Sequence, residues 1–144
     1  MRRLVAASAV ALLVVATGCG SGSGQSAAHK CDKAPAGIGP DANATLQDAD
    51  TGRTVCLKPG DVLTVFLHAP VGEDRWSSVT TRARDVLTPR STGVLTLPLG
   101  VTGAVYQAQN TGTAQLASTR PPCTSPGSTG CDPSHVWTAR IVVR

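Results

Sequence analysis

The stretch Lys58-Pro59-Gly60-Asp61-Val62-Leu63-Thr64-Val65-Phe66-Leu67-His68 decides the fold class. It begins with a turn, because proline fixes φ and glycine permits the left-handed corner that follows. Residues 63, 65 and 67 are aliphatic and alternate with residues 64, 66 and 68. This period of two is typical of a strand with one buried face. The stretch therefore predicts a turn followed by a β-strand that packs on a core.

Similar patterns recur on both sides of this stretch. Further strands are predicted at residues 54–57, 76–81, 94–97, 105–109, 114–118 and 137–143. Asn110-Thr111-Gly112 separates two of them and favours a β-hairpin. From Cys31 onward no stretch has the period of an amphipathic helix. The sequence thus predicts an all-β domain, an immunoglobulin-like antiparallel β-sandwich of about seven to nine short strands, with a small barrel as the structural alternative.

The composition agrees with one small β-domain. At 144 residues, the chain has room for one domain and a targeting segment. Aromatic residues make up only 3%, so the core must consist mainly of Val, Leu, Ile and Ala, and branched aliphatic side chains favour strands. The 15 glycines and 10 prolines require short elements.

Residues 1–18 have the organisation of an export signal. Arg2 and Arg3 precede an apolar stretch, 4–16, of about thirteen residues, which suits a signal peptide and is too short to span a bilayer. The stretch ends in Ala16-Thr17-Gly18-Cys19, which resembles the bacterial lipobox. That resemblance implies cleavage before Cys19 and attachment of a diacylglycerol to its thiol. A plain secretory signal that happens to contain this cysteine is the alternative.

Residues 19–30 are predicted to tether the folded domain, residues 31–144, to the membrane. The run Gly20-Ser21-Gly22-Ser23-Gly24 has the composition of a flexible linker. The expected location is the extracytoplasmic face of the cell membrane, through the lipid anchor. Removal of residues 1–18 lowers the net charge from +4 to +2. These charges are scattered, so no nucleic-acid partner is expected.

The cysteine count supports the same division of the chain. Of five cysteines, assigning Cys19 to lipid leaves four, which outside the cytoplasm should form two disulfides. Three pairings are open, and we favour Cys31 with Cys56 and Cys123 with Cys131, because each joins neighbours along the chain. Since there is no Cys-x-x-Cys and the three histidines are isolated, we expect no metal site and no cofactor.

The order of landmarks over residues 54–144 resembles the chagasin-type inhibitors of papain-like cysteine proteases, which have an immunoglobulin-like fold. The resemblance rests on residues 58–67, the loop ending in Trp76, Tyr106-x-Ala108, Gly112-x-Ala114-x-Leu116, Arg120-Pro121 and the terminal strand from Trp137. Such inhibitors insert three loops into the protease cleft. The resemblance implies that these loops are residues 68–76, 90–93 and 120–135.

Each implied loop keeps part of the family's motif. The first retains Pro70 and Gly72 but lacks the paired threonines, and it ends at Trp76. Ser91-Thr92-Gly93 is the best candidate for the second, glycine-rich loop. The third retains Arg120 and Pro121, with Pro122 in place of the aromatic residue.

A second resemblance is to lipoproteins of high-GC Gram-positive bacteria, the actinobacteria. It covers the lipobox, the Gly/Ser tether and the order Gly112-Thr113-Ala114, Arg120-Pro121-Pro122-Cys123, Cys131, Trp137. This resemblance implies the location and shape of the protein.

The candidate chemistry points to binding rather than catalysis. No serine lies in a Gly-x-Ser-x-Gly elbow, so we predict no enzyme activity. The tryptophans Trp76 and Trp137 lie in strand patterns, which favours core packing over ligand stacking. We predict a binding module that presents loops to an envelope protein, with inhibition of a papain-like cysteine protease as the alternative.

Overall fold

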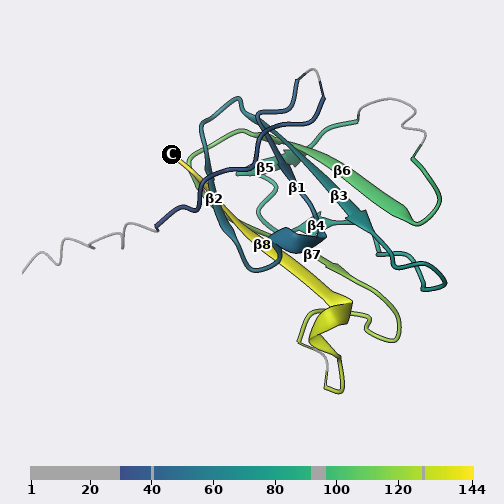
Figure 1. The fold of residues 1–144 in the computed structure, drawn as a ribbon. Helices are drawn as coiled ribbons and strands as arrows, with labels where there is room; N and C mark the ends of the chain where they lie inside the picture. The colour runs from purple at the N-terminus through teal and green to yellow at the C-terminus, as the bar shows by residue number, and fades with distance from the viewer. Residues whose placement is uncertain (1–29, 40, 92–96, 128) are drawn as a thin grey trace, which may run out of the picture.

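The computed structural model describes residues 30–39, 41–91, 97–127 and 129–144 (Figure 1). Its elements, in chain order, are β1 (Ala44–Leu46), the 3-10 helix η1 (Asp48–Asp50), β2 (Thr54–Leu57), β3 (Val62–His68), β4 (Thr80–Thr81), β5 (Leu87–Pro89), β6 (Val101–Ala108), β7 (Gly112–Thr119), the 3-10 helix η2 (Pro133–His135) and β8 (Val136–Val143). The signal, Cys19, the tether to residue 29 and residues 94–96 of one predicted strand lie outside the described residues.

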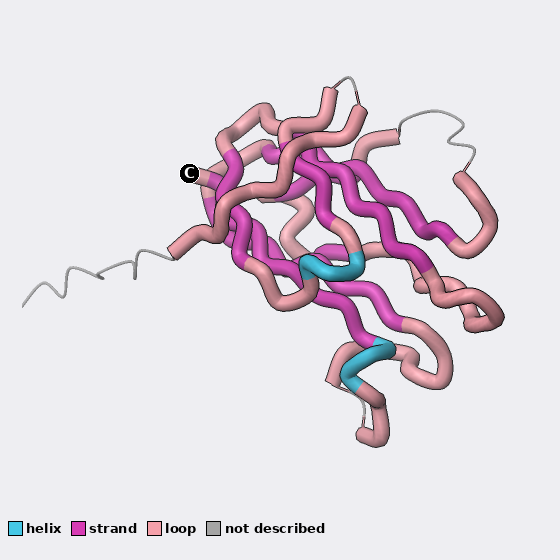
Figure 2. The backbone as a smooth tube through the Cα atoms, in the orientation of Figure 1, coloured by secondary structure: helices cyan, strands magenta, loops and turns pink. Residues whose placement is uncertain are grey.

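Eight strands form two four-stranded sheets that pack face to face, as the sequence predicts (Figure 2). One sheet has the order β1-β3-β6-β5 and the other the order β2-β8-β7-β4. The longest ladders are antiparallel: β3 pairs with β6 from Val62↔Gln107 to His68↔Val101, and β7 pairs with β8 from Gly112↔Val143 to Thr119↔Val136. The protein is therefore an all-β, immunoglobulin-like sandwich.

Two edge strands depart from the expected antiparallel pattern. The strand β1 runs parallel to β3, and β2 runs parallel to β8. This arrangement follows from the route of the chain, which passes from β1 through η1 to β2 and so crosses from one sheet to the other before β3 returns. The first two strands therefore cover one edge of each sheet.

The predicted hairpin at 105–118 is wrong. The strands β6 and β7 lie in different sheets, so residues 109–111 cross from one layer of the sandwich to the other. Contacts with the segment before β5 hold this crossing in place: the backbone N–H of Gln109 donates to Val86 O at 2.9 Å, and Asn110 Nδ2 donates to Asp85 O at 2.8 Å. The Asn110-Thr111-Gly112 signal does mark a turn, but this turn connects strands of different sheets and not two paired strands.

The alternating side chains of β3 and β8 enter a common core between the sheets. Leu63, Val65 and Leu67 are fully buried, as the period of two predicts, and Trp137 is 1% exposed. The indole Nε1 of Trp137 donates to Gln47 O at 3.0 Å, which satisfies its polar atom inside the core. Burial of each large aliphatic side chain stabilises the fold by about 1.5–3 kcal/mol.

The two disulfides are the pairs favoured from the sequence, Cys31–Cys56 and Cys123–Cys131. The first joins the beginning of the described chain to β2, and the second closes the loop between β7 and β8. In the described part of the chain, no helix has the length and apolar character needed to cross a membrane.

The two ends of the sandwich differ in what they carry. At one end lie the loops that follow β3, precede β6 and connect β7 with β8; we call residues 69–75, 97–100 and 120–135 the loop end. The first described residues and the C-terminus lie at the other end (Figure 1). There the N–H of Arg144 donates to Leu57 O at 3.0 Å, next to the disulfide-bonded Cys56.

Candidate protein-binding loops at one end

The first loop of the loop end is a tight turn with an apolar tip. The N–H of Glu73 donates to Pro70 O at 3.0 Å, and Gly72 has a φ of 83°, a left-handed conformation that favours glycine. This turn projects Val71 into solvent, where its exposed fraction is 105%. At the base, Trp76 Nε1 donates to His68 O at 3.2 Å and closes the loop.

The second loop presents another apolar side chain. The N–H of Val101 donates to Pro98 O at 3.2 Å, and this turn leaves Leu99 96% exposed. The two loops are neighbours, because the N–H of Ala69 donates to Gly100 O at 2.8 Å. Two large apolar side chains, Val71 and Leu99, thus project from adjacent turns.

The third loop is fixed by a disulfide and by a capped turn. The Cys123–Cys131 bond closes residues 124–130, and Cys123 itself is 6% exposed. Asp132 then caps η2, since its Oδ1 accepts from the N–H of Ser134 at 2.8 Å. Hydrogen bonds from Ser134 hold the pKa of Asp132 below its ordinary value.

Arg120 joins the first loop to the third. Its guanidinium forms an ion pair with Glu73 and donates to Ser134 O at 3.1 Å. The guanidinium carbon also lies 4.8 Å from the centre of the Trp76 ring, within cation–π range. Because Arg120 is only 5% exposed, it acts as an internal brace between loops and not as a surface charge.

The structure divides the predicted site residues into two groups. Pro70, Gly72 and Pro121 are exposed at the loop end, where they are accessible to a partner. Trp76 and Arg120 are buried and position the loops from inside. Of the proposed glycine-rich loop, Thr92 and Gly93 lie outside the described residues, and Ser91 is exposed.

Sequence reasoning missed two residues of the loop end and one ion pair within it. Val71 and Leu99 are its exposed apolar tips, and Glu73 is the partner of Arg120. A signal for the tips was present, because each is an aliphatic residue directly beside proline or glycine in a turn. No group of three or more His, Cys, Asp and Glu side chains suited to a metal ion occurs among the described residues.

Comparisons with known proteins relate the fold to protease inhibitors. Neither a scan against protein-family models nor a search of curated proteins gives a match. Among solved structures, the cysteine protease inhibitor EhICP2 from Entamoeba histolytica matches with a TM-score of 0.51 and 15% identity, over 69% of this chain and 93% of that chain. The solution structure of Amebosin matches with a TM-score of 0.44 and 14% identity, over 74% of this chain and 100% of that chain.

A third match is PbICP-C, solved in complex with falcipain-2, with a TM-score of 0.38 and 14% identity, over 74% of this chain and 93% of that chain. At this level of identity the likeness concerns the backbone arrangement. The described domain therefore has the chagasin-like immunoglobulin fold that the sequence predicts.

Proposed function

We propose that this protein is a lipid-anchored, non-enzymatic binding module whose loop end inhibits a papain-like cysteine protease. The observation that carries the proposal is the pair of exposed side chains, Val71 and Leu99, on two hydrogen-bonded neighbouring turns. Adjacent exposed apolar side chains favour a binding surface, because a partner that covers both removes more apolar area from water than one that covers a single side chain.

The rigidity of the loop end supports inhibition by insertion into a cleft. The first and third loops are braced by the pair Arg120–Glu73, and the third is closed by the Cys123–Cys131 disulfide. Preorganised loops lose little conformational entropy when they bind, and this smaller entropy loss raises the affinity. The exposed Pro70 and Pro121 add further restriction of the backbone beside the contact surface.

The proposed anchor is compatible with this geometry. Cys19, if lipidated, would hold the domain through residues 20–30, and the described chain begins beside Cys56, at the end remote from the loops. A tether attached there would direct the loop end away from the membrane. The same arrangement suits a binding module that captures an envelope protein without inhibiting it, which is the second candidate function.

The test is an inhibition titration of papain-like proteases with the oxidised domain, residues 25–144. We expect stoichiometric inhibition, and we expect Val71→Asp and Leu99→Asp each to weaken it by roughly tenfold or more, because a charge replaces an apolar anchor. Ile38→Asp is the matched control, since Ile38 is also apolar and 55% exposed but lies outside the loop end.

If the folded domain inhibits none of the papain-like proteases tested, this class of protease is excluded as the partner. Capture of an envelope protein that Val71→Asp abolishes and Ile38→Asp preserves would then establish the second candidate. Equal effects of all three substitutions on inhibition would show that the loop end is not the contact surface.

A further inference from the structure

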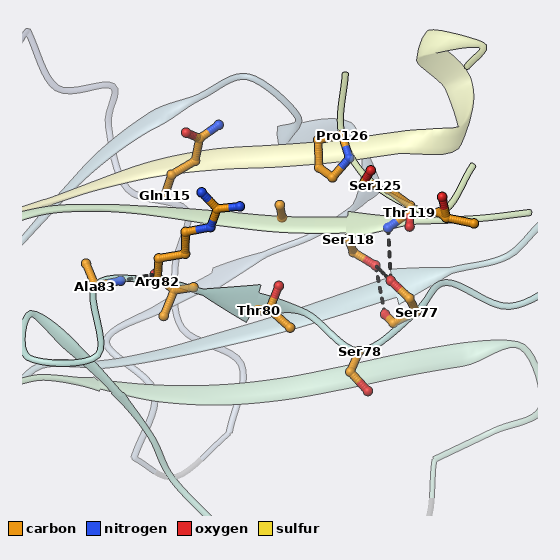
Figure 3. Close-up of a pocket in the computed structure, with 13 residues that line it drawn as sticks. Ser77, Ser78, Thr80, Arg82, Ala83, Gln115, Ser118, Thr119, Ser125 and Pro126 are labelled. Atoms are coloured by element: carbon orange, nitrogen blue, oxygen red, sulfur yellow. Dashed lines mark hydrogen bonds between the residues drawn. The ribbon is translucent and has the colours of Figure 1, made fainter. Parts of the chain in front are cut away.

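A groove of about 910 Å³ lies on the outer face of the sheet that contains β7 and β4 (Figure 3), and neither Val71 nor Leu99 lines it. It extends from Arg82 and Gln115 at one end to Ser125 and Pro126 at the other (Figure 3). This volume is in the range of small-molecule sites, about 300–1,000 Å³.

Strand alternation explains which side chains line the groove. Val79 is buried, so Ser78, Thr80 and Arg82 face outward on the segment that contains β4. The partner strand turns Gln115, Ala117 and Thr119 to the same face, and Thr80 pairs with Ala117. Because alanine is small, the middle of this ladder is low and forms the floor of the groove.

The third loop supplies the opposite wall. Residues 124–126 lie against the groove, and the neighbouring Cys123–Cys131 disulfide restricts them. The N–H of Cys123 also donates to Arg120 O at 2.9 Å, which fixes the beginning of this loop to the end of β7. The groove is thus built from a strand ladder and a cross-linked loop.

Eight of the 13 residues that line the groove carry a hydroxyl group, and the protein itself uses only some of these groups. The hydroxyl of Ser118 donates to Ser77 O at 2.7 Å, and that of Ser77 accepts from the N–H of Thr119 at 3.1 Å. Ser78 and Thr80 are exposed, and within the described part of the chain their hydroxyls have no hydrogen-bond partner. These groups are accessible to a hydroxyl-rich ligand.

The charge of the groove is positive. Arg82 is exposed and lies beside Gln115 at one end (Figure 3), and no residue that lines the groove carries a carboxylate. On the next strand, Arg140 pairs with Gln115 in the ladder and is exposed as well. An amide between two arginines suits a ligand that carries carboxylates next to hydroxyls.

We propose that this groove binds an acidic polysaccharide, with sugar hydroxyls along Ser78, Thr80 and Ala117 and a carboxylate at Arg82 and Gln115. The lining contains no aromatic residue, so stacked nucleobases do not fit it. The groove shares residues 124–126 with the loop end, whereas its residues on β7 and on the segment that contains β4 lie outside the loop end. Substitutions in those strands therefore test the groove separately from protease inhibition.

The test uses the complete mature protein and polygalacturonate as the probe, with fully methyl-esterified polygalacturonate as the uncharged control polymer. We expect saturable binding of the charged polymer, measured by affinity electrophoresis, and little retardation by the ester. Arg82→Gln should weaken binding by roughly tenfold, the effect of one charge-assisted contact. Arg84→Gln is the matched control, since Arg84 is an exposed arginine two residues away that does not line the groove.

A second variant separates the shape of the groove from its charge. Ala117→Phe fills the floor without changing the net charge and should abolish polymer binding while leaving protease inhibition unchanged. Thermal unfolding of each variant verifies that it is folded. Equal weakening by Arg82→Gln and Arg84→Gln, or equal binding of the esterified polymer, would overturn the proposal, because either result would mean that the groove does not select the ligand.

Discussion

At the scale of single residues, Arg120 shows how a charged side chain can organise a binding surface without being part of it. Its guanidinium is buried between Trp76 and Glu73, whereas the Glu73 side chain remains 48% exposed. The two partners therefore contribute unequally to stability. Loss of the carboxylate leaves a buried cation without its counter-charge, whereas loss of the cation leaves a carboxylate that water can solvate.

This asymmetry predicts the order of two substitutions. Glu73→Gln should lower the free energy of unfolding by about 1–3 kcal/mol, and Arg120→Met, which keeps the length of the side chain, by about 1 kcal/mol. Urea unfolding of the oxidised domain measures both. A larger loss for Arg120→Met would mean that the contacts of the guanidinium with Trp76 and Ser134 O, and not the ion pair, are the main stabilising interactions.

Tyr106 gives a prediction about pH. Its hydroxyl donates to Val79 O at 2.7 Å, and burial raises the pKa of this phenol, with the positive charge of Arg84 opposing the change. The folded state therefore holds the proton more tightly than the unfolded state, whose tyrosine ionises near 10.0. The resulting stabilisation is fully present below that pH and is lost as the pH rises towards the higher pKa of the folded state.

The measurement is the free energy of unfolding between pH 8 and pH 11. Tyr106→Phe should cost about 1 kcal/mol at pH 8, because the hydrogen bond to Val79 is lost. It should also remove part of the decline above pH 10. Identical slopes for the two proteins would contradict the role assigned to this phenol.

The chemistry of the loop residues could be read from the sequence only in part. Arg120 and Pro121 were identifiable because they stand side by side in a motif. Glu73 was not, because it lies 47 residues away from Arg120 and the two meet only when both sheets have formed. The contact between Trp76 and Arg120 could not be predicted for the same reason, because these two residues are also far apart in the sequence.

At the scale of secondary structure, predictability followed side-chain alternation. The range predicted at 54–57 coincides with β2, and the alternation predicted over residues 63–68 lies within β3, because apolar residues alternate there or flank a clear turn. The strand β1 was missed since all three of its residues are buried and no alternation marks it. The strand β5 was missed because it is short and ends in Pro89, which disfavours a strand.

The two disulfides allow a quantitative prediction at this scale. They close segments of different length, with separations of 25 residues for Cys31–Cys56 and 8 for Cys123–Cys131. Loss of chain entropy in the unfolded state predicts stabilisations of about 3.5 and about 2.5 kcal/mol, respectively. Paired cysteine-to-serine variants, compared by urea unfolding, test this order.

A smaller loss for the Cys31–Cys56 variant would contradict the entropic explanation. It would indicate that the segment around Cys31 remains close to β2 without the cross-link, through contacts such as the 2.7 Å bond from the N–H of Asp32 to Thr54 O.

At the scale of the whole molecule, the sandwich was predictable from the number and spacing of strands, but its topology was not. The crossing between β6 and β7, which lie in opposite sheets, includes the hydrogen bond from Asn110 to Asp85, a contact that no local pattern reveals. The parallel edge strands depend likewise on the path of the chain between layers. Local sequence specifies the strands, and long-range contacts specify their neighbours.

The proposed lipid anchor yields the prediction that concerns the whole protein. Cys19→Ala should release the protein from the membrane fraction, because a single thiol carries the proposed acyl anchor and residues 20–26 contain no apolar segment. The measurement is the partition between membrane and soluble fractions after a high-salt wash. Retention of this variant in the washed membranes would exclude the anchor.

The position of the Cys31–Cys56 bond has a mechanical consequence. Tension applied at the N-terminus passes through the sulfur atoms directly to β2 and bypasses residues 32–55, so β1 carries none of the load. If the opposite end of the domain is held by a partner, the force runs along the strand axes. The ladder hydrogen bonds between β2 and β8 and between β8 and β7 then resist together in shear, instead of opening one after another.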